Sequence, residues 1–423
     1  MSPATRTLAQ WLQYQEQLHP RTIDLGLERV ARVAQRLGLL PLRCRSVIVG
    51  GTNGKGSTSA AIAAMGQAHG LKTGLFTSPH LLRYEERIRI DGQSAAAADL
   101  VTDFEQIEAA RHGDSLTFFE FNALAALMRF RAERVALAVL EVGLGGRLDA
   151  VNLADADVAV LCSVGLDHCD WLGATREAIG REKAGIFRAH QPVVLGTADM
   201  PDSVDERLRA LQCRAVRAGI DFHWRRHDDG SWDYRDASGE LSNLPAPALA
   251  GAIQYQNAAS AIAALRALLA PRALDKSAVA QGLRELRLPG RLQVVAGPVE
   301  WLLDVAHNPA AAAVLASELR SRPVHGRTIA VLGMLGDKDV AAVAAELDAL
   351  VDAWVLCTID EPRGLDAEQL RARLGQVRGE CESSPGVAQG CERARALAVP
   401  GDRVLVCGSF HTVGPALQWL GLY

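Results

Sequence analysis

From about Ser46 onward, short apolar runs rich in β-branched residues alternate with longer helical patterns rich in Ala and Leu. Strands that are buried on both faces have this composition, and helices between such strands indicate a parallel sheet. The sequence therefore predicts an α/β protein. The expected strands cover residues 46–49, 135–140, 158–164, 192–195, 301–305, 328–332, 353–357 and 403–407.

A Pro-Gly turn in the segment LRLPGRLQVV divides this alternation into two parts. We predict an N-terminal domain over residues 1–288 with a mostly parallel sheet, and a smaller Rossmann-like domain over residues 289–423. Residues 221–244 are rich in Trp, Tyr, Asp, Gly and Ser and alternate only weakly. This composition predicts small antiparallel hairpins at the edge of the first sheet. A chain of 423 residues is long enough for two such domains.

Composition and charge exclude several classes of protein. The net charge of −4 argues against a generally basic surface for nucleic acid. Residues 258–270 form the most apolar stretch, but Arg266 interrupts it and it is too short to cross a bilayer. The eight cysteines are scattered without a CxxC pair, which predicts reduced thiols in the cytoplasm. Cys162 and Cys169 could bind zinc together with His168, although core cysteines are the commoner interpretation.

The strongest local motif is the segment SVIVGGTNGKGSTSAAIAAMG, in which a short strand, a glycine-rich turn and an Ala-rich helix follow one another. The backbone amides of such a turn bind phosphates, and Lys55 would neutralise their charge, so the segment predicts a P-loop. It departs from the usual GxxxxGK[ST] pattern in two ways. Gly56 stands between Lys55 and Ser57, and the spacing from Gly50 to Gly54 is one residue short. The alternative is a glycine-rich turn with a chance lysine.

Acidic and polar residues follow the next strands, at the sheet edge where open α/β proteins bind ligands. Glu141 ends an apolar strand and is the first candidate to hold a metal, although it could instead cap that strand through an ion pair with Arg147. His168 follows another strand in the segment GLDHCDWLG. It could join the metal site or be an ordinary loop residue. From spacing alone, Lys183 would be a surface lysine.

The second domain offers two similar strand ends. Asp304 ends a strand, and Asn308 can cap the helix that begins at Pro309. The last strand runs into Gly408, Ser409, Phe410, His411 and Thr412. These strand ends predict a second binding surface, with Ser409 and His411 as candidate contacts for an incoming amino acid. The alternative contacts are Asp337, Lys338 and Asp339 in GMLGDKD.

Several motifs together resemble one family. They are TIDLGLERV, GGTNGKGSTS, FTSPHLLRYEERI, LEVGLGGRLDA, LDHCDWLG, GREKAGIFR, LPGRLQ, DVAHNP, GMLGDKD and VCGSFHTVG. The chain is identified by them as a member of the dihydrofolate synthase/folylpolyglutamate synthase branch of the Mur ligase superfamily, and it resembles the bifunctional bacterial form most closely. The resemblance runs from about Trp11 to Thr412, and the inserted Gly56 is part of it.

The resemblance implies an ATP-dependent, ADP-forming ligase of folate biosynthesis and one-carbon metabolism. Such an enzyme joins L-glutamate to dihydropteroate and to reduced folates through an acyl phosphate. ATP is the co-substrate, two Mg²⁺ ions are the implied cofactors, and K⁺ is a candidate further ion. We expect a cytoplasmic monomer that binds these small molecules and neither nucleic acid nor a membrane.

The resemblance also implies roles for particular residues. The ATP site would comprise Thr52, Asn53, Gly54, Lys55, Gly56, Ser57, Asn257, Arg291, Asp304 and His307. Metal ligands would be Ser57, Ser78, Glu141, His168 and a carbamylated Lys183. The pterin pocket would comprise Thr22, Ile23, Asp24, Leu25, Thr117, Phe118, Phe119, Glu120, Leu148, Asp149 and Ala150. The catalytic residues would be Lys55, Glu141, His168 and Lys183.

Two of these roles rest on specific chemistry. A carbamate forms only on a neutral amine, so the pKa of Lys183 must lie well below the ordinary value of about 10.4. Asp24 and Asp149 could accept hydrogen bonds from the amino and ring N–H groups of the pterin. The alternative for Asp24 is that it caps the helix of LGLERVARVAQRLG.

Three other functions stay open from the sequence. A P-loop kinase or regulatory NTPase would explain the glycine-rich turn and Glu141, but it would not need DVAHNP and GSFHTVG. A nonenzymatic nucleotide-binding module would not need so many polar residues at strand ends. A monofunctional folylpolyglutamate synthase is the nearest competitor.

Overall fold

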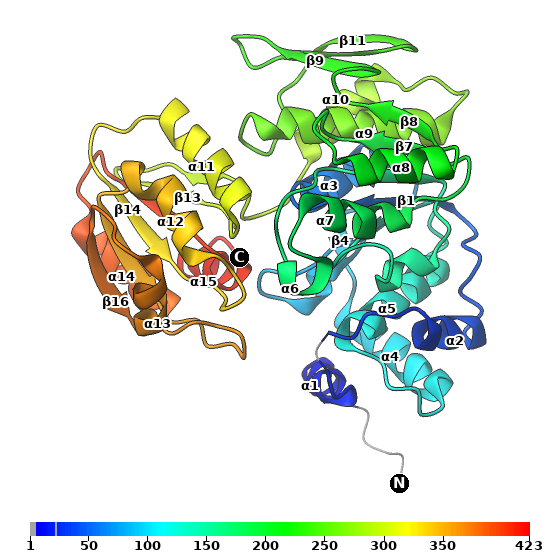
Figure 1. Ribbon diagram of the computed structural model, residues 1–423, viewed down its shortest axis with the longest axis horizontal. Helices are drawn as coiled ribbons and strands as arrows, with labels where there is room; N and C mark the ends of the chain where they lie inside the picture. The colour runs from blue at the N-terminus through cyan, green and yellow to red at the C-terminus, as the bar shows by residue number, and fades with distance from the viewer. Residues whose placement is uncertain (1–5, 22) are drawn as a thin grey trace. The chain divides into compact units, whose positions relative to one another are not determined.

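The computed structural model describes residues 6–21 and 23–423. The chain divides into two compact units (Figure 1). The first comprises Met1–Ala248 and Tyr255–Leu286, and the second comprises Leu249–Gln254 and Arg287–Tyr423. Thr22, which belongs to the predicted pterin pocket, lies outside the described residues. Each unit has its own sheet with helices packed around it, so the predicted α/β class is confirmed.

The first unit is built on an eight-stranded sheet with the order β4-β3-β2-β5-β1-β6-β7-β8. The strands β2, β5, β1, β6, β7 and β8 pair with one another in parallel. At the edge of the sheet, β3 pairs antiparallel with β2, and β4 pairs antiparallel with β3. The bounds are β1 Arg45–Gly50, β2 Thr73–Phe76, β3 Ile88–Ile90, β4 Gln93–Ser94, β5 Leu137–Glu141, β6 Val158–Leu161, β7 Pro192–Leu195 and β8 Arg214–Arg217.

The predicted position of the antiparallel hairpins is wrong. Strands β9 (Phe222–Arg226), β10 (Trp232–Asp236) and β11 (Gly239–Leu244) form a separate three-stranded sheet, and the antiparallel edge of the large sheet consists of β3 and β4. The small sheet lies beside α9 (Ile253–Leu269) and α10 (Lys276–Glu285) (Figure 1). An ion pair between Arg266 and Asp236 and the packing of Tyr255 on Trp232 hold it there.

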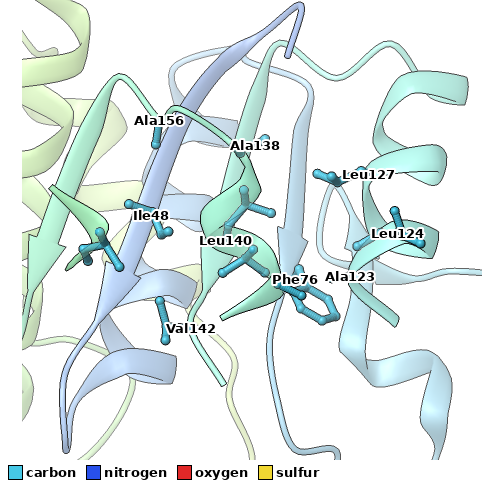
Figure 2. Close-up of a cluster of buried hydrophobic side chains, with 14 of the residues drawn as sticks. Ile48, Phe76, Ala123, Leu124, Leu127, Ala138, Leu140, Val142 and Ala156 are labelled. Carbon is cyan, nitrogen blue, oxygen red and sulfur yellow. The ribbon is translucent and has the colours of Figure 1, made fainter. Parts of the chain in front are cut away.

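The core of the first unit lies between the sheet and its helices. Figure 2 shows Ile48, Phe76 and Leu140 of the sheet in one buried cluster with Ala123 and Leu124 of helix α5. The helices of this unit are α1 Leu8–Leu18, α2 Glu28–Arg36, α3 Lys55–Ala68, α4 Ala97–Arg111, α5 Phe118–Ala132, α6 Cys169–Leu172, α7 Arg176–Lys183, α8 Asp202–Ala210, α9 and α10, with 3-10 turns η1 Tyr84–Arg87, η2 Ala150–Leu153 and η3 Ala184–Ile186.

The second unit contains a six-stranded sheet with the order β12-β13-β17-β14-β15-β16. Only β12 runs antiparallel to its neighbour. The strands are β12 Gln293–Val295, β13 Glu300–Leu303, β14 Thr328–Leu332, β15 Ala353–Cys357, β16 Glu380–Ser384 and β17 Arg403–Cys407. The helices are α11 Pro309–Ser321, α12 Val340–Leu347, α13 Ala367–Leu374, α14 Val387–Leu397 and α15 Phe410–Trp419, with the 3-10 turn η4 Asp348–Leu350. Among the described residues, no helix combines the length and apolar character of a membrane span.

Candidate active site

The glycine-rich turn joins β1 to α3 at the carboxyl end of the large sheet. Gly54 is the N-cap of α3 with a φ of +87°, and it offers no side chain to cap the helix. The first backbone N–H groups of a helix lack partners within the helix, and they carry partial positive charge. These amides are therefore available to an anionic ligand.

Neighbouring strands fix the shape of this turn. The N–H of Thr52 donates to the carbonyl of Ser163 at 2.8 Å, and the N–H of Asn53 donates to Oγ of Ser163 at 3.0 Å. Because residues 163–165 bond to the turn in this way, β6 ends at Leu161, earlier than predicted. Asn257 of α9 lies against the turn, since a methyl group on Gly54 would meet its Oδ1 at 2.8 Å.

Two lysines converge on the same carbonyl of this turn. Lys55 Nζ lies 3.0 Å from the carbonyl oxygens of both Gly51 and Thr52, and Lys183 Nζ lies 3.0 Å from that of Gly51. Lys183 is only 5% exposed, so the surface alternative for it is wrong. Burial, assisted by the charge of Lys55, lowers the pKa of Lys183 to about 7.

Glu141 reaches the same edge from β5, where it is paired in register with Val49 of β1. It is buried, and its Oε2 accepts the backbone N–H of Ser78 at 3.1 Å. The alternative ion pair between Glu141 and Arg147 is wrong, because Arg147 pairs with Glu182 at 3.0 Å. Glu141 and Ser78 are thus brought together beside the turn.

His168 precedes α6 in the left-handed region, with a φ of +52°. Its N–H donates to Oδ1 of Asp167 at 2.9 Å, and its ring Nε2 lies 3.9 Å from the same oxygen. Asp167 also acts on Lys183, where its negative charge favours the ammonium form and opposes the fall in pKa. This loop therefore belongs to the same electrostatic environment as Lys183.

The oxygen atoms at this sheet edge favour a hard cation that is bound partly by the protein and partly by a ligand. Within residues 6–21 and 23–423, no three His, Cys, Asp or Glu side chains gather as a complete metal-binding group. The buried Ser57 in the first turn of α3 and the Ser78–Glu141 pair offer oxygen atoms instead. Mg²⁺ takes few protein carboxylates and completes its shell with water and phosphate, so these residues fit it.

Arg29 joins two segments of the predicted pterin pocket, and sequence analysis missed it. Its guanidinium binds the carboxylate of Asp24, and its Nε donates to Oε2 of Glu120 at 2.9 Å. Asp24 does not cap α2, because the N-cap is Leu27. That alternative is wrong. The arginine five residues after Asp24 was the signal available in the sequence.

The third pocket segment is organised by Asp149. Its Oδ2 accepts the N–H groups of Gly143 and Leu144 at 2.9 Å each, and its Oδ1 accepts the N–H of Val151 at 3.0 Å. Burial raises the pKa of this carboxyl to about 6, although these hydrogen bonds oppose the shift. Phe119 packs against Gly143, where an added methyl group would lie 2.5 Å from its ring. The segments 117–120 and 148–150 thus meet at Gly143.

In the second unit, two of the residues predicted to bind ATP lie beside Phe410, and a third, Asp304, bonds to the neighbouring backbone. The Arg291 guanidinium lies 4.9 Å from the centre of the Phe410 ring, and the His307 ring lies 6.3 Å from it. Asp304 accepts the N–H groups of Leu292 and Ala306, each at 2.8 Å. Burial raises the pKa of the Asp304 carboxyl, and the charge of Arg291 opposes this shift.

The predicted glutamate contacts lie at the end of β17. Ser409 is buried, and its Oγ lies 2.7 Å from Oγ1 of Thr412. His411 is more exposed and pairs with Glu361 at 3.2 Å. The alternative residues follow β14, the strand that pairs with β17, and Lys338 Nζ lies 3.9 Å from Asp337 Oδ2.

Comparison with known families places this architecture. Residues 49–265 match the Mur ligase middle domain, and residues 290–410 match the Mur ligase glutamate ligase domain. The chain therefore belongs to the Mur ligase class. A dihydrofolate synthase/folylpolyglutamate synthase of Escherichia coli (strain K12) is 45% identical over 415 residues, which is 98% of this chain and 96% of the relative.

Solved structures agree with these matches. E. coli FolC in complex with DHPP and ADP has a TM-score of 0.94 and 44% identity, and the match covers 100% of this chain and 99% of that one. A bifunctional folylpolyglutamate synthase/dihydrofolate synthase with Mn, AMPPNP and L-glutamate bound has a TM-score of 0.91 and 43% identity, with 100% of both chains covered. The chain belongs to the dihydrofolate synthase/folylpolyglutamate synthase family, so the resemblance seen in the motifs is confirmed.

Proposed function

We propose that this protein is an ADP-forming ligase that joins L-glutamate to dihydropteroate and to reduced folates. The observation that carries the proposal is the meeting of an uncapped glycine-rich turn, two lysines and the buried Glu141 at one sheet edge. Family membership selects this function over a kinase or regulatory NTPase. The two activities for which the relatives are named favour two reactions over the monofunctional alternative.

The reaction needs activation of a carboxylate, because a carboxylate and an ammonium do not condense at neutral pH. The substrate carboxylate attacks the γ-phosphate of ATP, ADP leaves, and the amine of glutamate then displaces phosphate from the acyl phosphate. The turn at residues 51–54 acts as the P-loop, with the amides of α3 facing the phosphates. Lys55 leaves the carbonyls of Gly51 and Thr52 and binds the transferring phosphoryl group.

Two Mg²⁺ ions complete the site in this proposal. Ser57, Ser78, Glu141 and His168 are the residues that would hold them, together with a carbamate on Lys183. Bound Mg²⁺ supplies positive charge that lowers the repulsion between carboxylate and phosphate. The pKa of about 7 supports the carbamate, because a large neutral fraction of the Lys183 amine can react with CO₂. K⁺ stays a candidate further ion.

The pterin pocket is proposed in the first unit, over the segments 22–25, 117–120 and 148–150. Arg29 supports this, since it holds Asp24 against Glu120. Asp149 orders residues 143–151 through three backbone N–H groups, and its Oδ1, which accepts only one of them, retains a lone pair for a pterin N–H. We assign the ATP-binding and pterin-binding domain to residues 1–288.

The second domain, residues 289–423, is proposed to bind glutamate and to contribute to ATP binding. Arg291, Asp304 and His307 are the ATP residues. The position of Arg291 and His307 beside Phe410 and the charge interaction of Asp304 with Arg291 support this assignment. His411 is the better supported glutamate contact, because the Ser409 hydroxyl is already engaged with Thr412. The match of residues 290–410 to a glutamate ligase domain supports this role.

The test is a ligation assay with purified protein, ATP, Mg²⁺ and L-glutamate. Dihydropteroate and tetrahydrofolate are supplied in separate reactions, and products are identified by mass together with released ADP. Both acceptors should gain glutamate. Extension of tetrahydrofolate alone would leave the monofunctional alternative, and ADP release without any ligated product would support the NTPase.

A further inference from the structure

Arg87 is a buried cation that neither the predicted site nor the mechanism above uses. It is the last residue of η1 and immediately precedes β3. Its carbonyl accepts the N–H of Thr77 at 2.9 Å, next to Ser78. The residue is 8% exposed. An arginine this deep in a protein is normally paired with a carboxylate, because an isolated buried charge is costly.

The surroundings of Arg87 do not include such a partner. Its Nε donates to Nδ1 of His80 at 2.8 Å, and its guanidinium lies 5.3 Å from the Phe118 ring and 5.9 Å from the Tyr84 ring. Within residues 6–21 and 23–423, no carboxylate forms an ion pair with it. The nearby Glu86 accepts backbone N–H groups of residues 81–83 instead.

The electrostatics agree with this description. Burial lowers the pKa of the Arg87 guanidinium, and Tyr84, Glu86 and Glu141 oppose this only as Coulombic neighbours. The terminal nitrogens donate no hydrogen bond to a described residue, yet they are not among the buried nitrogen atoms sealed from solvent. Two planar N–H groups are therefore available to a ligand that enters from the site.

The position of Arg87 indicates which ligand this is. Arg87 lies over the ring of Phe118, which belongs to the proposed pterin pocket. It also interacts electrostatically with Glu141, which belongs to the proposed phosphate and metal site. The acceptor substrate must span the same interval, with its pterin in the pocket and its carboxylate at the γ-phosphate. We propose that Arg87 binds the carboxylate of the acceptor substrate, the group that ATP phosphorylates. This inference rests on the proposed function.

A guanidinium suits this role because it binds a carboxylate through two parallel hydrogen bonds and stays charged throughout. It would fix the direction of the attacking oxygen and reduce the repulsion between the carboxylate and the γ-phosphate. The contact of Nε with His80 leaves the outer edge of the guanidinium for the substrate. No bond to Arg87 forms or breaks.

The experiment compares two ligands and two proteins. Binding of dihydropteroate and of its carboxamide, in which the charged end is replaced by a neutral amide, is measured by calorimetry with the full chain. The wild-type protein should prefer the carboxylate by about 10-fold to 100-fold, as expected for charge-assisted hydrogen bonds. Arg87→Met should abolish this preference. Arg89→Met, which removes an arginine of the adjoining strand β3, should keep it.

Each outcome decides the proposal. If Arg87→Met binds with the wild-type preference, Arg87 does not bind the carboxylate. If that variant does not fold, as judged by circular dichroism, Arg87→Lys replaces it. The lysine keeps the charge but loses the paired geometry, so KM for dihydropteroate should rise while KM for ATP is unchanged. A rise in KM for ATP alone would assign Arg87 to the nucleotide and overturn the proposal. If the wild-type protein binds neither compound, the proposed function itself fails.

Discussion

Two turns in this protein each join the end of a strand to the start of a helix. They differ in whether a side chain caps the first backbone amides of that helix. In the uncapped turn (residues 50–55), Gly54 precedes α3 with no side chain to occupy the helix amides. In the capped turn (residues 304–309), Oδ1 of Asn308 accepts the N–H of Ala311 at 2.9 Å, and Pro309 removes a further donor. A βα turn can therefore bind an anion only where its own side chains do not already satisfy the helix.

The difference extends to the charges around each turn. Lys55 and Lys183 both approach the Gly51 carbonyl of the uncapped turn, which concentrates positive charge there. In the capped turn, the charged group is the carboxylate of Asp304, which accepts the N–H groups of Leu292 and Ala306. The uncapped turn offers its helix amides to a ligand. In the capped turn Asn308 satisfies the helix end, so the proposed contacts of this turn with ATP are the side chains of Asp304 and His307.

Removal of Lys55 should give the largest effect. Lys55→Ala deletes the side chain that we assign to the phosphoryl group, so kcat for ADP release should fall by about 10²-fold to 10³-fold or more. The melting temperature should be unchanged, since Lys55 Nζ contacts only carbonyls of its own turn. Lys72→Ala, which removes a surface lysine paired with Glu133, is the control. Normal turnover in a folded Lys55→Ala protein would remove the distinction between the turns.

Lys183→Ala should also be inactive, because it deletes the proposed carbamate beside the turn. Short carboxylic acids should restore part of the activity by refilling the anionic position. The pKa of about 7 means that the neutral, reactive amine predominates above this pH and the ammonium below it. At a fixed concentration of dissolved ¹³CO₂, the NMR signal of the carbamate should therefore grow as the pH rises through 7. Full activity of Lys183→Ala would contradict the assignment.

Gly54→Ala should raise KM for ATP by about tenfold, because orienting the amides depends on this residue. Alanine at this position would have to adopt a positive φ, and its methyl group would meet Oδ1 of Asn257. Gly70→Ala is a matched control, since Gly70 also has a positive φ, of +78°, and nothing lies within 4 Å of the methyl group that alanine would add. Gly54→Ala should lose more stability than Gly70→Ala, because only its methyl group meets a close neighbour, and only Gly54→Ala should lose affinity for ATP. Equal KM values in the two proteins would show that the shape of the turn is irrelevant.

A third turn, at the end of β17, tests whether an uncapped helix in the second unit also binds a ligand. Ser409 precedes α15 without capping it. His411→Ala should raise KM for glutamate by about threefold to tenfold, and Ser409→Ala should have a smaller effect. His325→Ala is the control, because His325 is an exposed residue of the same unit. If neither variant changes this KM, glutamate binds elsewhere, and Asp337, Lys338 and Asp339 become the candidates.

The fold was predictable where composition alone decides burial. The strands at 192–195, 328–332, 353–357 and 403–407 begin and end as predicted, because both faces of each are apolar or nearly so. The small sheet was misplaced, since its attachment depends on pairs that are distant in sequence, such as Arg266 with Asp236. Alternation along a strand gives no information about such partners.

The site was predictable where a motif carries the chemistry within a few residues. The glycine-rich turn and Glu141 are of this kind. Lys183 looked exposed from its spacing, and only its burial in the folded structure, together with the charge of Lys55, explains its low pKa. Arg29 and Arg87 were missed because their partners, Glu120 and His80, are chosen by tertiary structure and not by a local pattern.

The smallest effect is expected at the capped turn, and it completes the comparison. Asn308→Ala removes the acceptor for the N–H of Ala311, so the free energy of unfolding should fall by about 1 kcal/mol. Asn308→Asp keeps an acceptor at the same place and should retain most of the stability. Urea titrations of the three proteins would measure this order. Because this helix end binds no phosphate in our assignment, KM for ATP should stay the same in Asn308→Ala, in contrast to Gly54→Ala. A variant that keeps its stability and loses ATP affinity would show that the helix end at Asn308 also serves the nucleotide.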